Sequence, residues 1–211
     1  ERYYEAVVIG EYIGRRFADN PQFRAVALES SFMAILSYAQ AYQRSPPESR
    51  EFEAARMAAL CDFIEKKWPG DPKTDEVILT TGRVLADRSR PDLAALRFEK
   101  IGEASQFRLE AQLAAATAYW NAYLRQMANQ PNPPENQSPD TIGEVAGYPE
   151  LAHRKLQDCI RQAEKDRPPG RPQTGSLLLA RLTLAQIENQ QGKYQEARDA
   201  LMANSDSLIP Q

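Results

Sequence analysis

The residues that could carry catalysis are few and scattered. His153 is the single histidine of the chain, whereas a zinc site or a Ser-His-Asp arrangement needs several ligands or partners close together. Cys61 and Cys159 lie far apart on apolar helical stretches. We interpret both as buried apolar side chains, with a disulfide as the alternative. The sequence therefore predicts no catalytic residue, no metal ligand and no cofactor.

One short stretch has the glycine spacing of a phosphate-binding loop. It reads GRPQTGS from Gly170 to Ser176, but it lacks the lysine before the serine, and no predicted strand precedes it. The carboxylates, such as Glu99 and Asp158, are placed as helix-surface residues, and nothing pairs them across a cleft. We therefore expect a protein that is not an enzyme.

Composition narrows the class of partner. The 211 residues carry a net charge of −3, whereas a nucleic-acid surface needs a basic face. Apolar residues make up 42% of the chain and charged residues 26%, which is ordinary for a soluble protein with a continuous core. No window reaches the roughly 18 consecutive apolar residues of a membrane span. The expected partner is a protein or peptide, with no nucleic acid and no direct membrane span.

The apolar residues follow a helical period along almost the whole chain. Proline and glycine clusters, such as WPGDP at 68–72, divide it into segments. We predict helices at about 2–17, 22–43, 49–67, 74–87, 91–102, 106–128, 149–166, 175–190 and 193–204. Because the first helix begins almost at the first residue, we interpret the chain as a fragment of a longer protein.

Small and large residues recur at regular offsets in three stretches. The stretches cover 76–106, 108–124 and 178–210. In the first, Gly82 and Ala94 are small where two helices should cross, and Phe98 is large. Ala197 takes the place of Ala94 in the last stretch, and Gly192 is expected in its turn. Antiparallel helices approach closely only where one side chain is small, and larger side chains fill the space around it.

These offsets resemble those of tetratricopeptide repeats, 34-residue helix–turn–helix units that stack side by side. The resemblance covers most of the chain. It implies an all-α fold, a right-handed α-α solenoid of about four helical hairpins plus an N-terminal half-repeat, formed by 1–211 as a single domain. The junction at 68–72 is similar to that of one bacterial subgroup, the outer-membrane assembly lipoproteins and Tol-Pal-associated repeat proteins. Both an envelope or periplasmic location and a cytoplasmic one stay open.

The resemblance also implies which residues line the concave face, where repeats of this kind hold a partner. Carried over residue by residue, the partner-binding positions are Phe32, Arg83, Asp87, Glu110, Thr117, Trp120, Asn121, Gln186, Asn189 and Gln190. Trp and Arg often dominate interface energies. Two alternatives remain at this stage: Trp120 packs between adjacent units, and Arg83 pairs with Asp87 one helical turn away.

An insertion interrupts the third unit. The stretch 129–148 contains four prolines, three acidic residues and no basic residue, so it buries too little apolar surface to order itself. We expect a loop there, either mobile on the surface or in contact with a partner.

We expect a non-catalytic protein-interaction scaffold that binds a partner along its concave groove. Two alternatives are a regulatory or oligomerisation segment of a larger enzyme and a structural component of bacterial envelope assembly. A homodimer of the fragment is a further expectation, because repeat arrays without polar caps pair through their ends.

Overall fold

The structure is a computed structural model that describes residues 2–46, 48–87, 90–129, 147–166 and 175–202. These residues contain nine helices and no strand, so the all-α prediction is confirmed. The helices are α1 (Tyr3–Phe17), α2 (Arg24–Arg44), α3 (Arg50–Lys67), α4 (Pro72–Asp87), α5 (Pro91–Glu99), α6 (Arg108–Asn129), α8 (Tyr148–Asp166), α9 (Gly175–Gln190) and α10 (Tyr194–Met202). The continuous solenoid stays a prediction.

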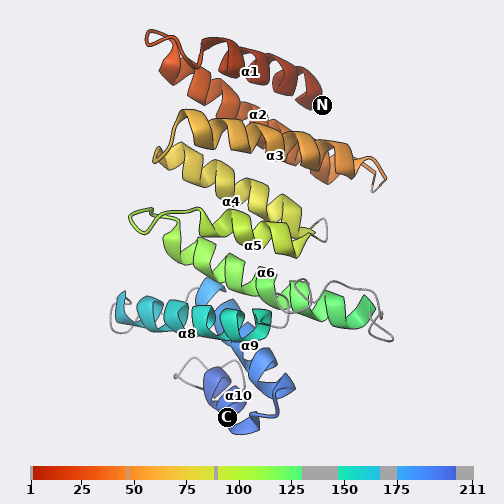
Figure 1. Ribbon diagram of the computed structural model, residues 1–211, viewed down its shortest axis with the longest axis vertical. Coiled ribbons are helices and arrows are strands. Elements are labelled where there is room, and N and C mark those ends of the chain that lie inside the picture. The colour runs from red at the N-terminus through yellow and green to blue at the C-terminus, as the bar shows by residue number, and fades with distance from the viewer. Residues whose placement is uncertain (1, 47, 88–89, 130–146, 167–174, 203–211) are drawn as a thin grey trace. The chain divides into compact units, whose positions relative to one another are not determined.

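The chain divides into two compact units, Glu1–Arg108 and Leu109–Gln211. In the first unit α1 to α5 lie side by side, each antiparallel to the helix before it (Figure 1). In the second unit α8 packs on α9, and α9 packs on α10. The rings of Tyr119 on α6 and Tyr148 on α8 lie 4.9 Å apart between their centroids.

Two glycines bring α1 into close contact with α2. A Cβ atom at Gly10 would lie 2.6 Å from the carbonyl oxygen of Ser30, and one at Gly14 would collide with the hydroxyl of Ser31. Ser31 is fully buried, and its hydroxyl donates a 2.8 Å hydrogen bond to the Ala27 carbonyl of its own helix. Only glycine therefore allows this approach of the two backbones.

Helix α1 thus forms a hairpin with α2. The division of the chain into four repeats and an N-terminal half-repeat stays a prediction. The stripe formed by Gly10 and Gly14, four residues apart on one helix face, is the signal for this pairing in the sequence.

The α4–α5 hairpin uses the small residues that the repeat pattern singles out. A Cβ atom at Gly82 would lie 2.8 Å from the Phe98 ring carbon Cδ1, so the ring covers the glycine directly. Ala94 is fully buried, and Phe98 is 2% exposed. The expected steric arrangement, with small residues at the crossing and a large residue over them, is present in this hairpin.

The turns between helices depend on two glycines with positive φ angles. Gly70 lies between α3 and α4, and Gly192 lies between α9 and α10; each has φ of 76°. Beyond Gly192, the N–H of Lys193 donates to the carbonyl of Glu188 at 2.8 Å, a bond that closes the C-terminus of α9. Gly192 therefore forms the expected turn.

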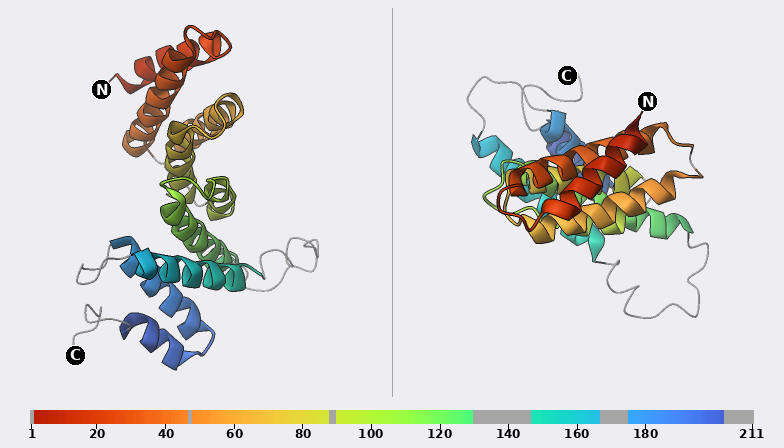
Figure 2. Two further views of the ribbon diagram at one scale, coloured as in Figure 1. Left: turned by 90° about the vertical axis from the view of Figure 1, so that its left-hand side faces the viewer. Right: turned by 90° about the horizontal axis from the view of Figure 1, so that it is seen from above.

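Charged side chains connect alternate helices of the first unit. Arg97 on α5 donates to Asp62 and Glu65 on α3, both at 2.5 Å, and Lys100 lies 2.6 Å from Glu65. Lys73 at the start of α4 pairs with Glu29 on α2. Helices α3 and α5 accordingly lie on the same side of α4 (Figure 2, left). Long polar side chains thus span the gap between alternate helices of the first unit.

In the second unit, α8 and α9 are connected by one hydrogen bond and one ion pair, both partly buried. His153 Nε2 lies 3.2 Å from Glu188, which is 5% exposed. Arg181, 2% exposed, pairs with Glu164. Because breaking the Arg181–Glu164 pair would leave a buried charge without its partner, this contact disfavours other registers of α8 on α9.

Several helix boundaries differ from the predicted ones by a few residues. Helix α5 ends at Glu99 rather than 102, because the N–H of Ile101 turns back to the carbonyl of Phe98, a tighter turn than an α-helix makes. Helix α4 begins earlier, at Pro72, because proline suits the first helical turn. Most of the predicted insertion at 129–148 and of the glycine-containing stretch at 170–176, and residues 203–204 of the last predicted helix, lie outside the described residues.

We predict that replacing Gly14 with alanine destabilises the protein by about 1–3 kcal/mol, because the new methyl group meets the Ser31 hydroxyl. Thermal and urea unfolding followed by circular dichroism measure the effect. Gly102→Ala is the matched control, because its added Cβ would have no neighbour within 4 Å. The Gly14→Ala/Ser31→Ala double variant should recover part of the loss. A rise in stability for Gly14→Ala alone would contradict the close contact.

Candidate functional site

The structure places three of the expected partner-binding residues in the first unit. Phe32 on α2 is half-buried, with the Lys73 ammonium 5.6 Å from its ring centroid. Arg83 on α4 is exposed. Asp87 is also exposed, and it accepts a 2.6 Å hydrogen bond from the Tyr42 hydroxyl on α2. Asp87 and Phe32 thus both contribute to the contact between α2 and α4.

The other seven expected residues lie in the second unit. Trp120 on α6 is only 3% exposed and stacks on Tyr123, with 5.5 Å between ring centroids. Its indole is therefore packed inside the protein, and its packing between adjacent repeat units stays a prediction. Glu110 and Thr117 are half-buried, and the exposed positions are Asn121 on α6 and Gln186, Asn189 and Gln190 on α9.

A groove of about 620 Å³ in the first unit is lined by a different set of residues. It lies between α1 and α3 and reaches Tyr38 of α2. The lining residues are Tyr4, Val7, Val8, Glu11, Tyr12, Arg15 and Arg16 of α1, Tyr38 of α2, and Phe52 and Arg56 of α3. We call this the α1–α3 groove.

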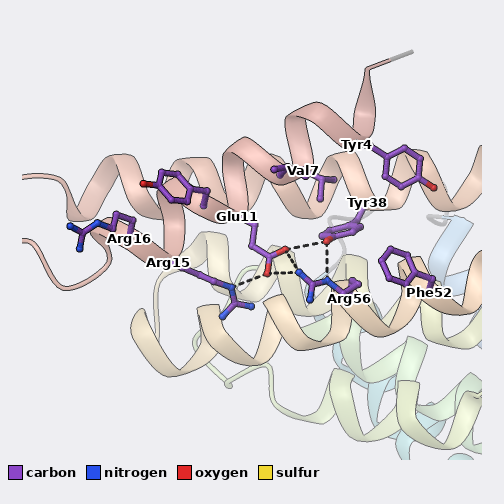
Figure 3. A pocket seen from close by; sticks show the side chains of 10 residues that line it. Tyr4, Val7, Glu11, Arg15, Arg16, Tyr38, Phe52 and Arg56 are labelled. Atoms are coloured by element: carbon purple, nitrogen blue, oxygen red, sulfur yellow. Dashed lines mark hydrogen bonds and ion pairs between the residues drawn. The ribbon is translucent and has the colours of Figure 1, made fainter.

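The carboxylate of Glu11 lies within the α1–α3 groove and joins three helices (Figure 3). Arg15 Nε donates to Oε1 at 2.8 Å, and Arg56 Nη2 donates to Oε1 at 3.1 Å and to Oε2 at 3.2 Å. The Tyr38 hydroxyl donates to Oε2 at 3.1 Å. Glu11 is 8% exposed, so these four bonds replace the water that the carboxylate gives up on burial.

The same bonds set the electrostatics of the neighbouring groups. Burial raises the pKa of Tyr38, although its bond with Arg56 opposes the shift. The bond to Tyr38 and the charge of Glu11 raise the pKa of Arg56 further above its already high value. Tyr38 therefore stays neutral and Arg56 stays charged. With both oxygens of Glu11 accepting hydrogen bonds, the cluster is built to hold a structure rather than to move a proton.

The walls of the groove are apolar and open to solvent. Tyr4, Val8, Tyr12 and Phe52 are each more than half exposed. The first three are spaced four residues apart, so they form one ridge along α1. At one end of this ridge the Tyr4 hydroxyl bonds to Glu53, which is 2% exposed, and lies 3.3 Å from the Ser45 hydroxyl oxygen. That bond to Glu53 raises the pKa of Tyr4.

Neither cysteine offers a reactive thiol. Cys61 on α3 is fully buried, with Nη1 of Arg97 from α5 3.6 Å from its sulfur, and burial raises its pKa to about 12. Cys159 is 3% exposed, and both are free thiols. The disulfide alternative is therefore wrong for this structure. A nucleophilic cysteine needs exposure and a lowered pKa, and Cys61 has the opposite properties.

Two searches of the described part of the chain bear on metals and membranes. No group of three or more His, Cys, Asp or Glu side chains is placed there to hold a metal ion. None of the helices described is both long enough and apolar enough to cross a bilayer. No protein family, curated protein or solved structure matches the chain, so the function rests on the geometry of this protein alone.

The groove residues were not singled out by the sequence. Tyr4 and Tyr38 are aromatic residues, which are more often core than binding site, and no pattern in the sequence assigned a role to Glu11, Arg15 or Arg56. One signal was available on α1: Tyr4, Val8 and Tyr12 form an apolar stripe beside the face that Gly10 and Gly14 present to α2. When a helix has two apolar faces, each face needs a neighbour that covers it.

We predict that Glu11→Gln lowers the free energy of unfolding by about 1–2 kcal/mol, because the two guanidinium groups lose their shared negative partner in a half-buried setting. Glu5→Gln, which changes an exposed pair with Arg2, is the control and should be nearly neutral. Urea unfolding measures both. Equal effects of the two substitutions would show that the Glu11 network contributes no more to the free energy of unfolding than an exposed ion pair does.

We predict that Cys61 resists thiol reagents in the native protein at pH 8 and reacts at once in denaturant. A Cys159→Ser background isolates the signal. Since the folded pKa of about 12 exceeds that of an exposed thiol, about 8.5, the contribution of Cys61 to stability is full below about pH 8.5. It is lost as the pH rises toward 12. In a Cys61→Ala variant, the free energy of unfolding should not show this loss as the pH rises. Rapid labelling of Cys61 in the native protein would contradict its burial.

Proposed function

We propose that this chain is a non-catalytic protein-interaction module and that its first unit docks a partner protein in the α1–α3 groove. The class of function is the expected one, but the binding surface differs from the expected surface. The expected surface lay on α2, α4, α6 and α9, whereas the groove is formed mainly by α1 and α3.

The observation that carries the proposal is the exposed apolar wall of a groove whose floor is rigid. Tyr4, Val8, Tyr12 and Phe52 leave most of their surface in water, and contiguous exposed apolar surface marks interaction sites. Beneath them, the bonds of Glu11 hold Tyr38 and Arg56 in one arrangement. A partner that covers the wall removes apolar surface from water without first having to order the floor.

The composition of the groove favours a protein over a small molecule. Three tyrosines, three arginines and a phenylalanine are among its ten lining residues, and aromatic residues and arginine are enriched in protein interfaces. A small-molecule site encloses most of its ligand, but here the walls stand open to solvent. The polar groups at the centre, Glu11 and Tyr38, already bond to each other and to the arginines.

We expect a photo-reactive phenylalanine analogue placed at Tyr12 to form a specific covalent adduct with a partner in the source cells. The same analogue at Tyr194, an exposed tyrosine on α10, is the control. Adding Val8→Asp and Phe52→Asp should abolish the adduct while the helical content, measured by circular dichroism, is kept. The same adducts at both positions, or an adduct unaffected by the two aspartates, would argue against docking in the groove.

A further inference from the structure

The lining of the α1–α3 groove contains three guanidinium groups and one carboxylate. Arg15, Arg16 and Arg56 line it, and Glu11 is its one acidic lining residue. This concentration of positive charge belongs to a chain whose net charge is −3. The groove is therefore basic on an acidic protein, and it attracts acidic partners selectively.

The arginines keep hydrogen-bonding capacity for a partner. The bonds to Glu11 use Nε of Arg15 and Nη2 of Arg56, and Nε of Arg56 faces Tyr38. Arg16 is exposed, and its guanidinium group has no hydrogen bond or ion pair within the described residues. A guanidinium carries five N–H groups, so each of these arginines can still bind a carboxylate from outside.

The shape of the groove suits a helix. Tyr4, Val8 and Tyr12 form one ridge on α1, and Phe52 and Arg56 form a second on α3, each with a spacing of four residues. A helix fits between such ridges by inserting its own side chains into the valley. The lining of α1, from Tyr4 to Arg16, is about 18 Å long at the α-helical rise, or somewhat more than three turns.

An extended peptide suits the groove less well. Its backbone N–H and C=O groups need partners when they are covered. The polar groups on the floor, Glu11 and Tyr38, are already bonded within the protein. A helix brings a backbone that satisfies its own hydrogen bonds and presents only side chains to the apolar walls.

We infer that the α1–α3 groove takes an acidic amphipathic helix of a partner protein. Its apolar face covers Tyr4, Val8, Tyr12 and Phe52, and its Asp or Glu side chains pair with Arg15, Arg16 and Arg56. The inference rests on the proposed function and names the chemistry of the partner. The charge of Arg16 selects the partner, and Arg16 has no role in the fold.

The test is a selection from a display library of random peptides of about 16 residues, more than four helical turns, with the full chain as bait. We expect enriched peptides with apolar residues three and four apart and with Asp or Glu beside them. Fluorescence anisotropy then measures the affinity of one enriched peptide. Proline at its centre should abolish binding, because it breaks a helix.

Charge reversal tests the pairing directly. Arg16→Glu should weaken the selected peptide about three- to tenfold, and the same peptide with Lys in place of its acidic residues should bind this variant better than the native protein. Arg198→Glu, at an exposed arginine of α10, is the matched control and should change nothing.

The outcomes separate the two proposals. The selected peptides could lose their binding to the Val8→Asp/Phe52→Asp variant and yet be basic, neutral or tolerant of proline. That result would overturn the inference of an acidic helix and would still support docking in the groove. Peptides unaffected by Val8→Asp/Phe52→Asp, or no enrichment at all, would overturn both. A homodimer, detected by light scattering, that dissociates in the Val8→Asp variant would assign the groove to a second copy of the chain and overturn the acidic helix as well.

Discussion

The buried carboxylate of Glu11 is the interaction on which the first unit's candidate site depends. It lies between Gly10 and Gly14 in the sequence, and those glycines bring α1 close enough to α2 for Glu11 to meet the Tyr38 hydroxyl at 3.1 Å. Arg56 extends the same network to α3. Without the carboxylate, two guanidinium groups would be left side by side without a counter-charge. The close contact of α1 with α2 and the charge pairing of α1 with α3 thus hold the three helices in one arrangement.

The groove follows from the way alternate helices are joined. Consecutive helices such as α4 and α5 pack small residues under large ones, as Gly82 and Phe98 do. Alternate helices such as α1 and α3, or α3 and α5, are connected by arginine and carboxylate side chains that span a wider gap. These long side chains hold the alternate helices apart, so that a space remains between the helices. Between α1 and α3, apolar residues form the walls of that space. The binding surface is therefore a consequence of the packing of the first unit.

The sequence predicted the helices well, and it did not bring forward the residues of the α1–α3 groove. Helical periodicity with proline and glycine punctuation is a local property, so the number of helices in the described residues and the turn at Gly192 agree with the expectation. The contact between Gly82 and Phe98 agrees because it joins neighbours within one hairpin. Trp120 looked like an interface residue, but it is packed at 3% exposure. Residue type alone does not tell a buried tryptophan from an exposed one on a helix with two covered faces.

By itself the sequence determined that the chain is helical, where its helices break, and that it lacks the spaced histidines and cysteines of metal or nucleophilic chemistry. Only the tertiary structure decided which charged residues meet. Glu11 and Arg56 are separated by 45 positions, and neither differs in type or spacing from the solvated charges around it. Their meeting depends on α1 and α3 both packing beside α2, a long-range arrangement set by close contact at Gly10 and Gly14. A charge becomes part of a site when burial removes its water, and burial is a property of the whole fold.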